Sequence, residues 1–190
     1  NKTIKNKKSN IKKALKYAKK FDGMKYSVTE TPPTRDGPPF WISNSPPPPI
    51  DYIKKYGSCC AGLINLMRRY VGLEVPGHVT GQTKHIFIGG TGAWFSYLNS
   101  KKRLHKIDYS KTYPDGTLLL QDYNPVDMGH VAVVFKSSKK GLLHSKIIHN
   151  VRGSFKKKKY REVVIEILED YPDNKRFTHI CLPKDWLVKN

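Results

Sequence analysis

The residue best suited to covalent chemistry is Cys60, in the stretch Gly57-Ser-Cys-Cys-Ala-Gly-Leu-Ile-Asn-Leu-Met-Arg-Arg-Tyr-Val-Gly72. Apolar residues recur at helical spacing after it and Gly72 is a typical stop, so the pattern predicts a buried helix beginning at the cysteine. Backbone N–H groups and the helix dipole at such a start favour the thiolate, which is the nucleophilic form. Core packing is the simpler interpretation, since free cysteine is one of the most buried residue types.

A nucleophilic cysteine needs a base within hydrogen-bond distance and a third group that fixes the tautomer of that base. Of the seven histidines, His130 and His149 each lie in an apolar run typical of a strand. His130 follows Gly129 at the start of its run, where its ring can reach a helix start packed on the sheet. His149 lies on the next strand, where it can hydrogen-bond to that imidazole. Each alone is typical of a half-buried structural histidine, but together with Cys60 they favour a catalytic triad.

Two further stretches are expected to border a substrate cleft. Gly89-Gly-Thr-Gly-Ala-Trp-Phe95 has neither the order of G-x-G-x-x-G nor the lysine of a phosphate loop, which argues against nucleotide binding. We expect a turn here, with Gly90, Thr91 and Trp94 at the cleft. Residues 30–50 are rich in proline, which enforces extended backbone, and Trp41 would pin this loop as a cleft wall. A polyproline ligand for an aromatic groove is the alternative.

The elements that must hold these residues read as helices first and strands afterwards. Residues 1–10 predict a flexible basic start, and helical spacing follows from Ile11 to Phe21. Short apolar or alternating runs then predict a meander of strands. We therefore expect a single α+β domain over residues 11–190, with N-terminal helices packed on an antiparallel sheet and the proline-rich loop inserted. The predicted strands cover residues 117–120, 130–135, 146–150, 160–168 and 177–182, before a short terminal helix or turn.

Composition limits the classes of partner. The chain has 35 Lys+Arg against 15 Asp+Glu, a formal net charge of +20, so we expect weak, nonspecific attraction to polyanions. Only three cysteines occur, which argues against a disulfide framework, and no metal-ligand spacing is present, so a zinc site is not expected. No apolar run is long enough for a transmembrane segment. The Lys-, Asn- and Tyr-rich composition is typical of an AT-rich genome.

In this order the chain resembles the NlpC-type papain-like cysteine peptidases, whose members mostly cut peptides of bacterial cell walls. The resemblance covers residues 11–153 and includes a helix before a Gly-x-x-Tyr segment, a cysteine at a helix start, and two strands that each carry a histidine. The matching motifs are Gly23-Met-Lys-Tyr26, Cys59-Cys60-Ala61-Gly62-Leu63-Ile64, Gly72-Leu-Glu-Val-Pro76-Gly77, Pro114-Asp-Gly-Thr-Leu-Leu-Leu120, His130-Val-Ala-Val-Val134 and Ile148-His149-Asn150.

The resemblance implies roles for these positions. Cys60 would be the nucleophile, His130 the base and His149 the orienting residue. Tyr26 and Ala61 would line the active site, with the Tyr26 hydroxyl near the developing oxyanion. Asn150, beside His149, would belong to the substrate cleft. The implied reaction is acyl transfer to Cys60, followed by hydrolysis of the thioester by water activated at His130, and it needs neither a metal nor an organic cofactor.

The departures from the family pattern concern the substrate more than the triad. Cys59 replaces the usual aspartate before the nucleophile, and Ala61 replaces a serine. Relatives with this fold act on peptide, amide and lipid ester bonds, so the resemblance implies peptidoglycan stem peptides only as the leading substrate. The alternatives are a protein peptidase or isopeptidase, a lipid acyl hydrolase or transferase, and a non-catalytic basic protein associated with nucleic acid or a virion.

Overall fold

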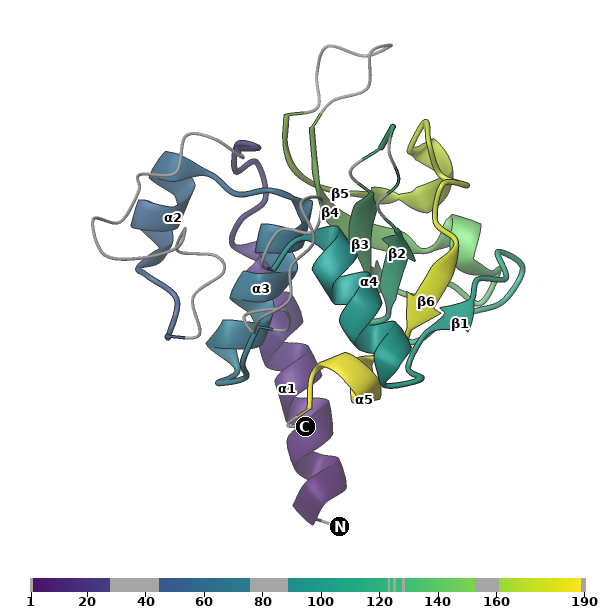
Figure 1. The fold of residues 1–190 in the computed structure, drawn as a ribbon, viewed down its shortest axis with the longest axis horizontal. Helices are drawn as coiled ribbons and strands as arrows, with labels where there is room; N and C mark the ends of the chain where they lie inside the picture. The colour runs from purple at the N-terminus through teal and green to yellow at the C-terminus, as the bar shows by residue number, and fades with distance from the viewer. Residues whose placement is uncertain are drawn as a thin grey trace.

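The computed structural model describes residues 2–27, 45–75, 89–122, 124, 126–127, 129–152 and 161–188. Within them, helices and an antiparallel sheet form one α+β arrangement, as the sequence predicts (Figure 1). Most of the proline-rich loop, including Trp41, lies outside the described residues. In the described part, no helix is both long and apolar enough to cross a membrane.

The helices precede and follow the sheet in the chain, and two 3-10 turns connect strands. The α-helices are α1 (Lys2–Lys19), α2 (Ile50–Tyr56), α3 (Cys60–Tyr70), α4 (Thr91–Ser100) and α5 (Pro183–Trp186). The strands are β1 (His105–Lys106), β2 (Leu118–Gln121), β3 (His130–Lys136), β4 (Lys146–Val151), β5 (Glu162–Ile167) and β6 (His179–Cys181). The 3-10 turns are η1 (Leu142–His144) and η2 (Leu168–Asp170).

The sheet has six strands in the order β1-β6-β2-β3-β4-β5, and all the neighbouring pairs are antiparallel. Strands β3 and β4 therefore lie side by side, and β4 is the neighbour of the edge strand β5. This adjacency brings the strand that starts with His130 next to the strand that carries His149, because β3 and β4 pair directly through an antiparallel ladder.

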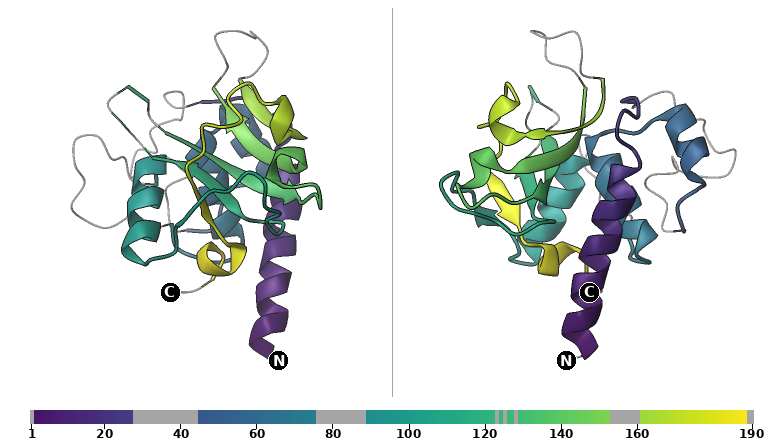
Figure 2. Two further views of the ribbon diagram at one scale, coloured as in Figure 1. Left: turned by 90° about the vertical axis from the view of Figure 1, so that its right-hand side faces the viewer. Right: turned by 180° about the vertical axis from the view of Figure 1, so that it is seen from behind.

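The helices cover one face of this sheet. Helix α3 packs against β3 and β4, α1 packs on α3, and α4 lies against β2. Nearly every residue of α3 is buried, which explains its apolar sequence. The N-terminal end of α1 extends past the domain (Figure 2). A second apolar cluster covers the opposite face, where Leu119, Ala132 and Ile147 meet Tyr171 and Phe177.

Three helices differ from the prediction. Helix α1 begins at Lys2 rather than Ile11. Residues 2–10 contain neither glycine nor proline, the two residues least favourable in a helix, so the helix extends through them. Helix α2 was not predicted. The predicted turn at residues 89–95 is instead the start of α4, with Gly90 at its N-cap.

A tertiary contact explains why α4 starts where it does. The buried Asn65 side chain, on α3, donates to the Gly89 carbonyl at 2.8 Å and accepts from the Trp94 indole at 2.6 Å. Both bonds come from a residue distant in sequence, so local sequence pattern could not reveal them.

Candidate active site

Cys60 is the first residue of α3, and its side chain is buried, with 8% of its surface exposed. Cys59 is the N-cap of the helix in extended conformation, and its Sγ accepts a hydrogen bond from the Gly62 N–H at 3.3 Å. Cys59 thus performs the capping role for which aspartate is among the preferred residues. This accounts physically for a cysteine at the position where the resembling family has aspartate.

The loop before the helix is fixed by hydrogen bonds from two other parts of the chain. The Ser58 carbonyl accepts from the Ser27 N–H at 2.9 Å and from the Asn150 side-chain amide at 2.5 Å. Gly57 adopts a φ of +83°, and a Cβ there would lie 2.6 Å from the carbonyl oxygen of Lys25. Glycine is required because the two backbones approach so closely.

Tyr26 lies beside this loop, paired with Ser58 through an isolated parallel bridge. Burial raises the pKa of its hydroxyl, and so do the nearby thiols of Cys60 and Cys59. The side chain therefore stays protonated and can donate a hydrogen bond next to the nucleophile.

The two histidines form a continuous hydrogen-bonded chain that ends on a carboxylate. His130 Nε2 lies 3.0 Å from His149 Nδ1, and His149 Nε2 lies 2.9 Å from Glu166 Oε1. His130 and His149 are 5% and 1% exposed, respectively. Glu166 comes from β5, on the same face of the sheet as His149, because His149 is paired in register with Val164 two residues away.

Electrostatics at Cys60 favour a thiolate. A hydrogen bond from the Cys59 thiol holds the pKa of Cys60 well below its usual range, and hydrogen bonding and charge from His130 act in the same direction, against the opposing effect of burial. The Thr91 hydroxyl adds a smaller contribution, with its Oγ1 3.6 Å from Cys60 Sγ. The same thiol pair, together with burial, raises the pKa of Cys59, which remains the protonated donor.

His149 is held neutral at physiological pH. Burial lowers its pKa to about 4, although hydrogen bonding to Glu166 raises it in part. A neutral imidazole with one ring nitrogen donating and the other accepting can link His130 to Glu166.

Aromatic residues enclose the histidine pair. The Tyr171 ring meets the His149 ring edge-on at 4.8 Å between centroids, and the Phe177 ring lies 5.7 Å from His130. These contacts limit rotation of both imidazoles and exclude water from them.

Arg176 holds this aromatic wall in place. Its guanidinium donates to the Tyr171 hydroxyl at 3.1 Å, to Asp127 Oδ2 at 2.8 Å and to Gln121 Oε1 at 2.5 Å. Gln121 is paired in register with His130 across β2 and β3, so the network lies next to the histidines.

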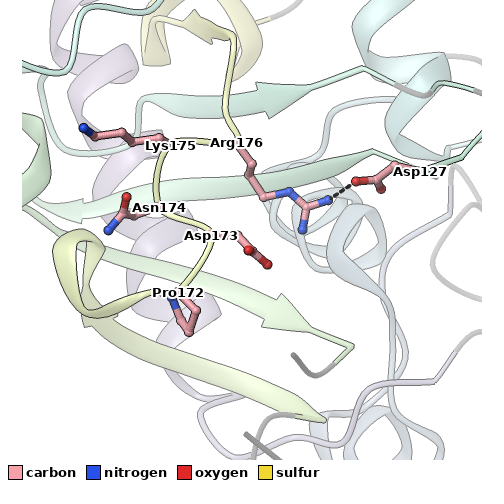
Figure 3. A pocket seen from close by; sticks show the side chains of 6 residues that line it. All are labelled: Asp127, Pro172, Asp173, Asn174, Lys175 and Arg176. Atoms are coloured by element: carbon pink, nitrogen blue, oxygen red, sulfur yellow. Dashed lines mark hydrogen bonds and ion pairs between the residues drawn. The ribbon is translucent and has the colours of Figure 1, made fainter. Parts of the chain in front are cut away.

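A pocket of about 490 Å³ opens beside this network and is lined by charged and polar side chains (Figure 3). Arg176 points across it to Asp127, and the loop that follows η2 supplies the rest of its wall (Figure 3). The pocket adjoins Tyr171 rather than Cys60, and none of the residues predicted for the cleft lines it. Its lining is Asp127, Pro172, Asp173, Asn174, Lys175 and Arg176.

Several predicted lining residues have other positions. Trp94 and Asn150 are completely buried, one bonded to Asn65 and the other to the nucleophile loop, so neither can line a cleft. The side chain of Ala61 belongs to the core between helices and sheet, so only its backbone reaches the site. Thr91 does border the nucleophile, and Gly90 precedes it at the start of α4.

Sequence reasoning missed Glu166, Tyr171 and Arg176. A signal for Glu166 was present: Val163, Ile165 and Ile167 alternate along β5, which places Glu166 on the opposite face of the strand. Nothing in the sequence indicates that this face meets His149. Tyr171 and Arg176 lie in an irregular segment without a motif.

No family model matches the chain, and no curated protein compared with it matches either. The described residues contain no group of three or more His, Cys, Asp or Glu side chains arranged to hold a metal ion.

Proposed function

We propose that this chain is a cysteine hydrolase that cleaves an amide bond, with Cys60, His130 and His149 as its catalytic triad. The observation that carries the proposal is a thiol with a lowered pKa at a helix start, next to an imidazole that is hydrogen-bonded to a second, neutral imidazole. A nucleophile, a base and an orienting group are the parts that acyl transfer requires.

We also propose that the domain is a papain-like fold of the NlpC type. The supporting features are the order of the elements and their contacts: a leading helix, a Tyr26 segment beside the nucleophile loop, a buried helix that begins at Cys60, and adjacent antiparallel strands that carry the two histidines.

In the first half-reaction, the Cys60 thiolate attacks the carbonyl carbon of the substrate and the carbonyl oxygen becomes an oxyanion. In this proposal, the backbone N–H of Cys60 and the hydroxyl of Tyr26 donate hydrogen bonds that stabilise the oxyanion. Protonated His130 gives its proton to the leaving amine as the C–N bond breaks. The product is a thioester on Cys60 and a free amine.

In the second half-reaction, neutral His130 removes a proton from water, which attacks the thioester carbonyl. Collapse of this intermediate releases the carboxylic acid and restores the Cys60 thiolate and the His130 imidazolium. Neutral His149 accepts a hydrogen bond from His130 throughout and stabilises its positive charge.

The substrate class that we propose is the stem peptide of peptidoglycan. The net charge of +20 supports attraction to an anionic wall polymer. Protein amides and lipid esters are the alternative substrates for the same chemistry, and the pocket beside Arg176 does not distinguish between them.

The test compares wild type, Cys60→Ala and the control Cys181→Ala on purified peptidoglycan of several wall types. Cys181 is a buried cysteine on β6, outside the site. We expect wild type and Cys181→Ala to release the same peptides, and Cys60→Ala to release none. Identical profiles for Cys60→Ala and wild type would contradict the wall-peptidase proposal. If Cys60-dependent cleavage occurred only with a protein amide or a lipid ester, the proposed substrate would be wrong and the proposed cysteine chemistry would stand.

A further inference from the structure

The chain of hydrogen bonds behind the nucleophile ends on a residue that the proposed triad does not contain. Glu166 lies 2.9 Å from His149 Nε2, and its side chain is 13% exposed, whereas the side chain of His149 is completely buried. The sheet aims the carboxylate at the imidazole, because both project from the same face of neighbouring strands. A surface salt bridge would not have this geometry.

The carboxylate fixes the tautomer of His149. An ionised carboxylate can only accept hydrogen bonds, so His149 Nε2 must carry the proton that it shares with Glu166. Neutral His149 then has its lone pair on Nδ1. That atom faces His130 Nε2 at 3.0 Å and accepts a hydrogen bond from it.

The same constraint passes to His130. Since its Nε2 donates to His149, the proton of neutral His130 resides on Nε2 and the lone pair on Nδ1. Because Nε2 is occupied by His149, Nδ1 is the ring nitrogen left for the hydrogen bond with the Cys60 thiol. To remove a proton, His130 needs its lone pair on Nδ1, the nitrogen that faces Cys60.

We propose that Glu166 is a positioning residue that sets the tautomers of both histidines, so that Nδ1 of His130 is the basic atom facing Cys60. The inference rests on the proposed function, and it names one residue more than the triad. Without an acceptor at Glu166, the proton of neutral His149 could lie on Nδ1 instead of Nε2. His130 Nε2 would then have to accept, and its Nδ1 would carry a proton and could no longer remove one.

The chain offers a matched control for this claim. Glu169 also pairs with a histidine, since its Oε2 lies 3.2 Å from His144 Nδ1. That pair is exposed, at 46% and 56%, and lies outside the site. Changing Glu169 removes the same chemical group from a histidine that has no catalytic neighbour.

The experiment records histidine tautomers by long-range ¹H–¹⁵N NMR in wild type, Glu166→Met and Glu169→Met, assigned with His149→Gln. In wild type and in Glu169→Met we expect neutral His149 to be protonated on Nε2 only. His130 should keep its Nε2 proton both as the imidazolium beside the Cys60 thiolate and as the neutral imidazole formed when Nδ1 has given up its proton. In Glu166→Met we expect this pattern to be lost. Protonation of His149 on Nδ1 in wild type would overturn the proposal, even if Glu166→Met failed to fold.

A second readout needs no substrate. The rate of Cys60 alkylation by iodoacetamide at pH 7 should fall about 10- to 100-fold in Glu166→Met and stay unchanged in Glu169→Met. Glu166→Gln should recover part of the rate, because its amide oxygen can still accept from His149. An unchanged rate and unchanged tautomers in Glu166→Met would refute the positioning role. Correct tautomers without hydrolysis of any substrate would instead refute the proposed function.

Discussion

The two adjacent cysteines divide the tasks at the start of α3. Cys59 caps the helix through Gly62 and donates to its neighbour, while Cys60 is the acceptor that faces His130. A single sulfur could not cap the helix and also act as the thiolate. The cap and the acidity of the nucleophile are therefore coupled through one thiol.

The first prediction concerns this coupling. Cys59→Ala removes the cap and the donor, so it should lower the free energy of unfolding by about 1 kcal/mol and raise the pKa of Cys60. Cys59→Ser replaces the thiol with a hydroxyl that can make both contacts, so it serves as the matched control. Denaturant unfolding and the pH dependence of alkylation measure the two effects. Equal stability and equal alkylation profiles for both variants would show that Cys59 has neither role.

The second prediction concerns the buried imidazole of His149. Its pKa is lowered from 6.5 to about 4 in the folded protein, so between these pH values the unfolded chain binds more protons than the folded one. Stability should therefore fall as pH falls from 6.5 to 4, by about 3 kcal/mol from this residue, and level off below.

The measurement is urea unfolding of wild type and His149→Gln at several pH values in that window. Glutamine does not titrate, so the difference in stability between the two proteins should change with pH. Parallel curves across the window would mean that His149 is not held neutral.

At the scale of elements, the nucleophile loop depends on close contact between two backbones. Residues 25–27 and 57–58 run side by side, and Asn150 on β4 completes their hydrogen bonds. Through this contact the sheet that carries the histidines also fixes the start of α3. The relative position of Cys60 and His130 is thus set by backbone rather than by flexible side chains.

The third prediction compares two glycines with positive φ. Gly57→Ala would place a Cβ 2.6 Å from the Lys25 carbonyl, whereas at Gly72 a Cβ meets nothing within 4 Å. Gly72→Ala should cost about 1–2 kcal/mol from backbone strain alone. Gly57→Ala should cost more and also slow Cys60 alkylation, because the loop must move. Thermal unfolding and alkylation rates check this, and equal effects of the two variants would contradict it.

How much the sequence could predict also depends on the element. Helix α3 and strands β3 and β4 follow from strong periodicity, and the motif order named Cys60, His130 and His149, of which His130 and His149 lie within hydrogen-bond distance of each other. Helix α4 was missed because Asn65 anchors it from a distance. Glu166 was missed because its contact with His149 depends on the register between β4 and β5, and strand pairing is not written in local pattern.

At the scale of the whole molecule, the basic charge lies on the surface, whereas the groups of the candidate active site are buried. The chain carries a net +20, and four lysines, Lys12, Lys13, Lys16 and Lys19, lie exposed along α1 without an acidic residue in that helix. The histidine and cysteine groups are buried and close together, so salt should screen the surface charge far more than the site.

The fourth prediction follows from this separation. Raising the salt concentration from 0.05 to 0.5 M, about a threefold decrease in Debye length, should weaken binding to anionic peptidoglycan. The rate of Cys60 alkylation by neutral iodoacetamide should not change. Cosedimentation with the polymer and alkylation under the same conditions check both parts. A salt-sensitive alkylation rate would mean that the site is not shielded, and salt-insensitive binding would remove the role of the basic surface.

The most direct test of the central claim is the pH dependence of Cys60 alkylation in wild type and His130→Gln, with Cys181→Ala in both to leave Cys60 as the readily ionised thiol. If His130 and the thiol pair activate Cys60, the wild-type rate should reach half its maximum well below the ordinary thiol pKa of about 8.5, and His130→Gln should shift this midpoint upward. A wild-type midpoint at the ordinary value, unchanged in His130→Gln, would contradict a catalytic Cys60.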